Sequence, residues 1–237
     1  MTRRRWIADQ MSGDRALLLG RNAEHLSRVL RAQIGQQYEI ATPDGVRLGT
    51  IVEITAEAVA FSLSDLPDAQ RNQSQIVTHL YLAVFKFDRF EWAVEKCTEL
   101  GVSSMIPVIA QRTDSHLAKS AASRVARWRR IALEAAQQSR RDAAPEILDP
   151  KRVNEAIAEA PGKRIVLAET EREQRLADLL EAGSPTSFAV GPEGGWTESE
   201  LALFRESGWI SASLGLNILR AETAAITTLA IAQAFGY

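Results

Sequence analysis

The stretch that most constrains the fold of this chain lies near its carboxy terminus, at Phe188–Tyr237. It holds two short apolar runs that look like buried strands, and each leads into a glycine-marked turn, first Gly191–Gly195 and then Leu214–Arg220. In α/β sheets, ligands bind in the crevice beyond the carboxyl ends of the strands, where such turns gather. Glycine also lets backbone N–H and C=O groups approach a ligand closely, because no Cβ intervenes. The stretch therefore predicts an α/β sheet with a ligand pocket at these two turns.

The segment that follows the second turn, Ala221–Phe235, is apolar on nearly every side. A helix that is hydrophobic all round must be buried, so we expect either another subunit or neighbouring loops to cover it. The segment is too short and too rich in threonine to span a membrane.

A strand–helix alternation extends back from these turns through more than half of the chain. Strand-like runs lie at Ile76–Phe85, Ser104–Ala110, Arg164–Ala168, Ser187–Val190 and Ile210–Leu214, and helix-like segments at Asp88–Leu100, Ala121–Arg141, Gln174–Leu180 and Thr197–Ser207. Thr197 and Glu200 have the spacing of a capping box at the start of the last of these helices. Alternation of this kind predicts a mainly parallel sheet with helices on both faces.

The first part of the chain has a different pattern, in which short strand-like runs are separated by tight turns. Pro43-Asp44-Gly45 has the composition of a hairpin turn. One helix is expected at Asn22–Ile34, with Asn22 as its N-cap and Gly35 as its stop. We therefore expect a small β-barrel over residues 1–70, a polar linker at Leu66–Gln75, and an α/β domain over residues 76–237.

Composition excludes several classes of protein. A single cysteine among 237 residues rules out a disulfide framework. The start, MTRRRWIADQ, turns polar before the apolar region of a signal peptide could form. The three histidines are scattered without the spacing of metal ligands. These features predict a soluble cytoplasmic protein, with no membrane partner and no metal.

The formal net charge is only −2, but arginines are concentrated at the start of the chain and over residues 112–141. Segregated arginines suggest a polyanion bound on one face. The alternative is a solvated helix face with local ion pairs, and charge alone slightly favours that alternative.

Several familiar catalytic motifs are absent from the sequence. It contains no G-x-G-x-x-G after a strand, no Walker A sequence and no G-x-S-x-G elbow. Cys97 lies within an expected helix and is better explained as a small buried hydrophobe than as a nucleophile. Arg220 and Glu222 invite a catalytic interpretation, although Glu222 in a first helical turn also complements the helix dipole. The Gly191–Gly195 segment could likewise be only a tight turn before the capped helix.

Four ordered motifs resemble those of one family. They are GPEGG-W-T-x-x-E, then LG-x-x-ILR-x-ETA, the earlier K-x-TELGV at Lys96–Val102, and Glu134–Arg140 followed by Pro145, with Arg4 and the segment Glu24–Arg31 in agreement. Together they resemble the 16S rRNA (uracil-N3) methyltransferases of the knotted SPOUT superfamily over nearly the whole chain. One departure is Leu216-Asn217, where the family often has a basic residue before ILR.

The resemblance implies an N-terminal barrel like the PUA RNA-binding domain. It also implies a C-terminal SPOUT domain whose chain end is threaded through a loop to form a trefoil knot. The implied cofactor is S-adenosylmethionine (SAM), bent against three loops at the knot, and the implied assembly is a homodimer around the last helix. By position, the implied cofactor-binding residues are Leu167, Ala168, Glu169, Thr170, Gly191, Pro192, Glu193, Gly194, Gly195, Leu214, Gly215, Leu216, Asn217, Ile218, Leu219 and Arg220.

The implied reaction is methyl transfer to N3 of one uridine, position 1498 in the usual numbering, in the 16S rRNA of the small ribosomal subunit. Arg220 is assigned to stabilise the uracil anion, and Glu222 is a candidate base or orienting residue. The arginines expected to hold RNA phosphates are Arg3, Arg4, Arg5, Arg28, Arg31, Arg112 and Arg140. Two alternatives remain open: an RNA-binding adaptor without enzymatic activity, and a SPOUT enzyme acting on another RNA target or atom, such as a ribose 2′-hydroxyl. A nucleotide-phosphate enzyme would need a phosphate loop, which the sequence lacks.

Overall fold

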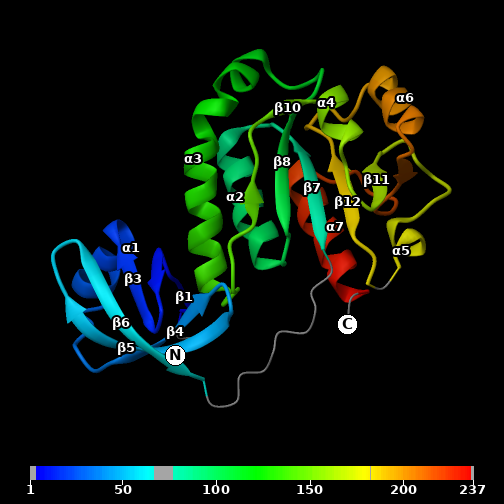
Figure 1. Cartoon of the computed structure of the whole chain (residues 1–237). Coiled ribbons are helices and arrows are strands. Elements are labelled where there is room, and N and C mark those ends of the chain that lie inside the picture. Colours follow the sequence, from blue (N-terminus) through cyan, green and yellow to red (C-terminus); the bar gives the residue numbers. More distant parts are fainter. Residues whose placement is uncertain (1–3, 67–76, 182, 236–237) are drawn as a thin grey trace. The chain divides into compact units, whose positions relative to one another are not determined.

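The computed structural model describes residues 4–66, 77–181 and 183–235 (Figure 1). The chain forms two compact units, one made of Met1–Gln73 with Ala136–Ala143 and the other of Ser74–Ala135 with Ala144–Tyr237. The segment Ala136–Ala143 therefore belongs with the first unit, although it lies far from the rest of that unit in sequence. Arg3 and all of the expected linker except Leu66 lie outside the described residues.

The first unit is built on a six-stranded sheet in the order β1-β4-β5-β6-β3-β2. Its strands are β1 (Trp6–Ile7), β2 (Gln10–Ser12), β3 (Arg15–Leu19), β4 (Gln37–Thr42), β5 (Gly45–Ile54) and β6 (Ala58–Asp65). The β1–β4 pair is parallel and the other pairs are antiparallel. Trp6, Ile40 and Phe61 are fully buried in its core. The hairpin turn at Pro43-Asp44 is confirmed, whereas closure of the sheet into a barrel stays a prediction.

The single helix expected at Asn22–Ile34 was wrong in its bounds and type. The chain instead forms α1 (Gly20–Glu24), with Leu19 as its N-cap, followed by the π-helical η1 (His25–Val29). The Leu30 N–H donates to the His25 carbonyl at 2.9 Å, a bond that reaches back five residues. Arg31 then takes a left-handed φ of 52°, which ends the helix well before Gly35. A π-turn differs so little from an α-helix in side-chain period over five residues that the pattern could not distinguish them.

The second unit is built on a parallel sheet in the order β10-β8-β7-β12-β11-β13, with β9 paired to β8 (Figure 1). Its strands are β7 (Thr78–Ala83), β8 (Ser104–Ile109), β9 (Glu146–Ile147), β10 (Lys151–Arg152), β11 (Lys163–Leu167), β12 (Thr186–Val190) and β13 (Ile210–Ala212). Its helices are α2 (Phe87–Glu99), α3 (Ser115–Gln138), α4 (Val153–Ala158), α5 (Leu176–Leu179), α6 (Glu198–Glu206) and α7 (Ala221–Ala234). The expected parallel α/β sheet is confirmed.

Alternate side chains of the strands form two cores, one on each face of this sheet. Leu80 and Leu82 of β7 pack with α2, α3 and α7, whereas Tyr81 and Ala83 pack with α4 and α6. Helices therefore cover both faces, as the alternation predicts. Cys97 is fully buried in the first of these cores, and burial raises its thiol pKa, which confirms that it packs as a small hydrophobe.

Some bounds differ from the expected ones. Helix α3 begins at Ser115 rather than Ala121, and α4 was not anticipated. Asp114 explains the early start of α3, because its carboxylate accepts the N–H of His116 at 2.7 Å and so satisfies a first-turn donor.

Helix α7 is buried on one side only within this chain. Ala225, Leu229 and Ala232 are buried against the sheet and α2, whereas Ala230 and Ala234 are exposed. The alternative in which the chain's own loops cover this helix all round was therefore wrong. None of the described helices is long and apolar enough to cross a bilayer.

Candidate functional site

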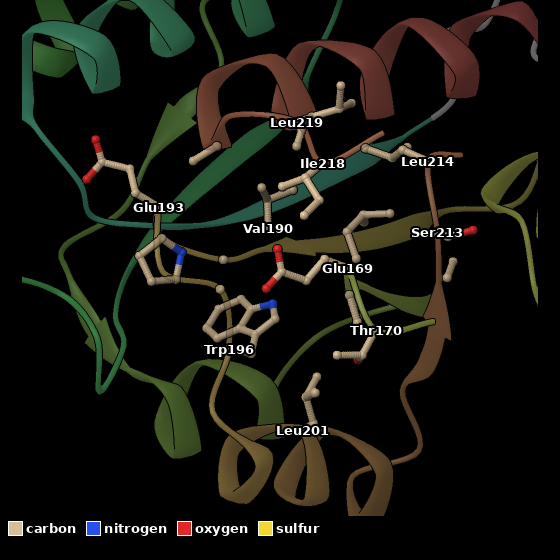
Figure 2. Close-up of a pocket in the computed structure, with 18 of the residues that line it drawn as sticks. Glu169, Thr170, Val190, Glu193, Trp196, Leu201, Ser213, Leu214, Ile218 and Leu219 are labelled. Atoms are coloured by element: carbon tan, nitrogen blue, oxygen red, sulfur yellow. The ribbon is translucent and has the colours of Figure 1, made fainter. Parts of the chain in front are cut away.

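A pocket of about 590 Å³ opens at the carboxyl ends of three adjacent strands, β12, β11 and β13 (Figure 2). The loops after these strands form its walls, because parallel strands deliver their following loops to one edge of the sheet. Every residue expected to bind the cofactor lines this pocket except Gly194 and Arg220. The structure thus brings three segments that are distant in sequence into one site.

The glycine turn after β12 keeps its shape through close contacts. A Cβ at Gly191 would lie 3.3 Å from the Trp196 indole nitrogen, and Gly195 has a left-handed φ of 70°. At Gly195 a Cβ would also lie 3.1 Å from a carboxylate oxygen of Glu169. These glycines therefore allow the turn to pack directly against the pocket wall.

Thr197, two residues after the turn, caps α6. The Thr197 hydroxyl accepts the Glu200 N–H and the Glu200 carboxylate accepts the Thr197 N–H at 2.8 Å, so the expected capping box is confirmed. The other oxygen of the buried Glu200 carboxylate accepts the Gln111 N–H at 2.7 Å. The loop after β8 is thereby joined to the start of α6.

Arg112 in that same loop supports the glycine turn. Its Nη1 donates to the carbonyl oxygens of Gly194 and Trp196. Arg112 also lines the pocket. We expected its guanidinium to hold RNA phosphates; the structure shows Nη1 engaged with the turn, and the RNA contact stays a prediction.

Several residues that line the pocket were missed in the sequence, among them Trp196, Leu201, Ser213, Arg172 and Arg205. Trp196 follows GPEGG directly, so its place in the chain was a usable signal. Its side chain is 7% exposed, and its indole Nε1 has no hydrogen-bond partner within the described part of the chain. Figure 2 shows this indole and the Glu169 carboxylate directed into the pocket. Walls that combine apolar side chains with polar groups, among them the Glu169 carboxylate and the unpaired indole N–H, suit a ligand with both apolar and polar parts.

Neither of the two residues assigned to catalysis is among the residues that line the pocket. Arg220 is exposed and precedes α7, between Leu219 and Ala221, which both line the pocket. Glu222 is 6% exposed and is not among the pocket residues. Its carboxylate lies 3.9 Å from Nε of Arg89 on α2. The placement of Glu222 favours an orienting role over direct proton transfer.

The arginines expected to hold RNA have different surroundings in the first unit. Arg5 has a side chain only 12% exposed, and it hydrogen-bonds to the carboxylates of Glu39 and Asp142. Arg140 also pairs with Glu39. Burial pushes the pKa of Glu39 upward, but hydrogen bonds from these two arginines outweigh it and lower the pKa overall. Arg5 and Arg140 thus contribute internal ion pairs.

Two of the remaining candidates in this unit, Arg28 and Arg31, are exposed, whereas Arg4 is half-buried. Arg28 is exposed and pairs with Glu24 at 2.8 Å, and Arg31 is exposed on its left-handed turn. The guanidinium of Arg4 lies 5.0 Å from the ring centre of Trp6.

Within residues 4–66, 77–181 and 183–235, no group of three or more His, Cys, Asp or Glu side chains is placed to hold a metal ion.

Comparison with known proteins agrees with this geometry. A family model described as the RNA methyltransferase domain matches residues 72–233. The chain is 32% identical over 215 residues to ribosomal RNA small subunit methyltransferase E of Synechocystis, covering 88% of this chain and 69% of that protein. The enzyme of the same name from Bacillus subtilis is 29% identical over 223 residues, covering 90% of this chain and 87% of the relative.

Solved structures agree as well. The structure of ribosomal RNA small subunit methyltransferase E from Neisseria gonorrhoeae, bound to S-adenosyl methionine, has a TM-score of 0.85 and 26% identity, covering 99% of this chain and 98% of that one. The chain therefore belongs to the RNA methyltransferase domain family and, within it, to the ribosomal RNA small subunit methyltransferases E.

Proposed function

We propose that this protein transfers a methyl group from SAM to N3 of a single uridine, position 1498, in the 16S rRNA of the small ribosomal subunit. One observation carries the proposal: three loops at the carboxyl ends of adjacent parallel strands form one pocket, in a chain that belongs to an rRNA methyltransferase family. A relative with 26% identity is bound to the same cofactor.

The residues of the pocket fit SAM. Its volume of about 590 Å³ lies within the roughly 300–1,000 Å³ of sites for drug-sized ligands. Val190, Leu214 and Leu219 supply apolar surface for an adenine ring, while Glu169 and the Trp196 indole N–H supply polar partners. When bound, the cofactor supplies an electrophilic methyl group attached to a sulfonium.

We propose that Arg220 acts on the acceptor. Uracil N3 carries a proton at neutral pH, so its attack requires loss of that proton and stabilisation of the resulting anion. The exposed guanidinium of Arg220 would donate to the O2 and O4 oxygens of the uracil. Glu222, buried two residues later, would orient this end of α7. The pocket walls would hold donor and acceptor in line, which supplies much of the rate.

The RNA would bind with its target uridine unpaired or flipped, because N3 is concealed by base pairing. We propose that the first unit is a PUA-like barrel that holds the RNA, with Arg28 and Arg31 as its accessible phosphate contacts. We propose that the reaction takes place in the cytoplasm, and an rRNA substrate supports this location.

The second unit is proposed to carry a trefoil knot at the carboxy-terminal loops and to form a homodimer through α7. The exposed apolar residues Ala230, Ala234 and Phe235 at this end of the chain support a dimer, because such a surface is stabilised by a second copy. Light scattering of the purified protein distinguishes a dimer from a monomer.

Nucleoside mass spectrometry of 16S rRNA tests the function. A strain lacking the protein should lose 3-methyluridine, and expression of the wild-type chain should restore it. Loss of a 2′-O-methylated nucleoside instead would assign another acceptor atom. An unchanged nucleoside profile, together with no SAM binding by calorimetry, would favour an RNA-binding adaptor.

A further inference from the structure

Arg89, on the first turn of α2, lies between two acidic side chains from different edges of the site. Its Nη1 is 3.2 Å from Oε1 of Glu193, and its Nε is 3.9 Å from Oε1 of Glu222. Glu193 belongs to the Gly191–Gly195 turn, whereas Glu222 lies in the first turn of α7, two residues after Arg220. One guanidinium therefore interacts with both the turn of the pocket and the helix that follows the third loop.

Glu222 depends on this arginine for its charge balance. Its side chain is buried, and its Oε2 has no hydrogen-bond partner among the residues that the structure describes. Burying an ionised carboxylate is costly unless an opposite charge compensates it. Within residues 4–66, 77–181 and 183–235, Arg89 supplies the one cation within 4.0 Å of this carboxylate. At 3.9 Å the interaction is electrostatic rather than a hydrogen bond.

Glu193 attaches the glycine turn to the same cation. In Figure 2 its carboxylate points away from Glu169 and Trp196. The turn is thus held on one side by Arg112, through the carbonyls of Gly194 and Trp196, and on the other by Arg89, through Glu193. Arg89 itself is not among the residues that line the pocket.

We propose that Arg89 is a positioning residue that fixes the Gly191–Gly195 turn relative to the first turn of α7, so that the cofactor pocket and Arg220 keep one arrangement. It acts through Glu193 and Glu222 and touches neither reactant. This inference rests on the proposed function and adds to it a coupling between cofactor binding and the placement of Arg220.

The experiment compares Arg89→Gln, Glu222→Gln and the double variant with wild type. SAM affinity is measured by calorimetry, kcat and KM on 16S rRNA by methyl incorporation, and stability by thermal melting. Arg89→Gln should weaken SAM binding by roughly 5- to 150-fold, the range found for coupled sites, and should also lower kcat. The double variant should recover much of the lost thermal stability, because the neutral amide that replaces the Glu222 carboxylate leaves no buried charge unpaired. Its SAM affinity and kcat should stay as low as those of Arg89→Gln, because the link between the turn and α7 is absent in both.

Arg127→Gln is the matched control. Arg127 also pairs with a residue of α2, donating two hydrogen bonds to the Glu91 carboxylate at 2.6 and 2.7 Å, and neither residue lines the pocket. Its loss should lower stability without changing SAM affinity or kcat. If Arg89→Gln yields no folded protein, Arg89→Lys keeps the charge but not the fork of donors; it should fold and still bind SAM more weakly than wild type.

The inference is overturned if the Arg89 variants bind SAM and turn over as Arg127→Gln does, or if the double variant is as impaired as the two single changes combined. Wild-type protein that binds no SAM would instead refute the proposed function. In that case the interaction between Arg89 and Glu222 is tested by thermal melting alone. Arg89→Gln should unfold at a lower temperature than the double variant, and the opposite order would overturn the inference.

Discussion

Gly195 offers a direct way to perturb the pocket by one methyl group. Its φ of 70° is left-handed, a conformation that costs an L-residue about 1–2 kcal/mol. In Gly195→Ala the new Cβ would lie 3.1 Å from Oε1 of Glu169, so that carboxylate must shift by a few tenths of an ångström. For a chain of this size, the free energy of unfolding should fall by about 1–2 kcal/mol and the Tm by about 2–8 °C.

The displaced Glu169 should also change ligand binding. Losing one hydrogen bond to a charged group costs about 1.5 kcal/mol, which corresponds to about tenfold weaker binding of SAM. Gly208→Ala is the control, because Gly208 has a φ of 77° and a Cβ there would meet no heavy atom within 4 Å. It should lose similar stability, because the backbone cost is the same, and should bind SAM as wild type does.

Urea denaturation and isothermal calorimetry measure both quantities on the same preparations. Equal SAM affinity for Gly195→Ala, Gly208→Ala and wild type would refute the idea that Glu169 and the Gly191–Gly195 turn form the cofactor wall.

Three further outcomes are expected at the site and in the first unit. Arg220→Ala should lower kcat by roughly a hundredfold or more while SAM affinity measured by calorimetry stays near wild type; equal loss of both would show that Arg220 supports the cofactor loop instead. Replacing Arg28 and Arg31 by Gln should make the plot of log RNA affinity against log salt concentration less steep, by about 0.7–0.9 for each phosphate that these arginines neutralise. An unchanged slope would show that neither arginine contacts the RNA. The pKa of Glu39 is lowered from an ordinary value of 4.5 in the folded protein. The ion pairs of Glu39 therefore stabilise the fold above about pH 4.5, and this stabilisation is lost as the pH falls through the folded pKa. The stability difference between wild type and Glu39→Gln in urea titrations should therefore shrink as pH falls from 7 to 3, and a constant difference would contradict the role of its charge.

The parallel sheet was predictable because its strands are short, apolar and separated by helices with recognisable ends. Thr197 and Glu200 marked the start of α6, and the runs before Gly191 and Leu214 marked strands whose loops share one edge of the sheet. The topology of a parallel sheet then brings those loops together. Local sequence therefore located most of the pocket.

Features that depend on distant side chains were not predictable in this way. Arg5 and Glu39 are 34 residues apart, and Arg140 and Glu39 are 101 apart, so their pairing is invisible to local pattern. The hydrogen bond from Arg112 to the Gly194 carbonyl joins two residues that are 82 positions apart in sequence. The RNA roles of all three arginines followed from the family resemblance, whereas charge alone slightly favoured local ion pairs. Clustering in sequence does not reveal which carboxylates or carbonyls fold against a given arginine. The π-helical turn at His25–Val29 was not predicted for a different reason: it is too short for its side-chain period to be distinguished from that of an α-helix.

We propose that the loops after β11, β12 and β13 hold the methyl donor. A crystal structure of the protein soaked with SAM tests it most directly. The donor should lie in the pocket between Glu169, Trp196 and Leu219, with its methyl group toward the side of Arg220. Donor found at another place on the protein, or crystals that take up none at saturating concentration, would contradict it.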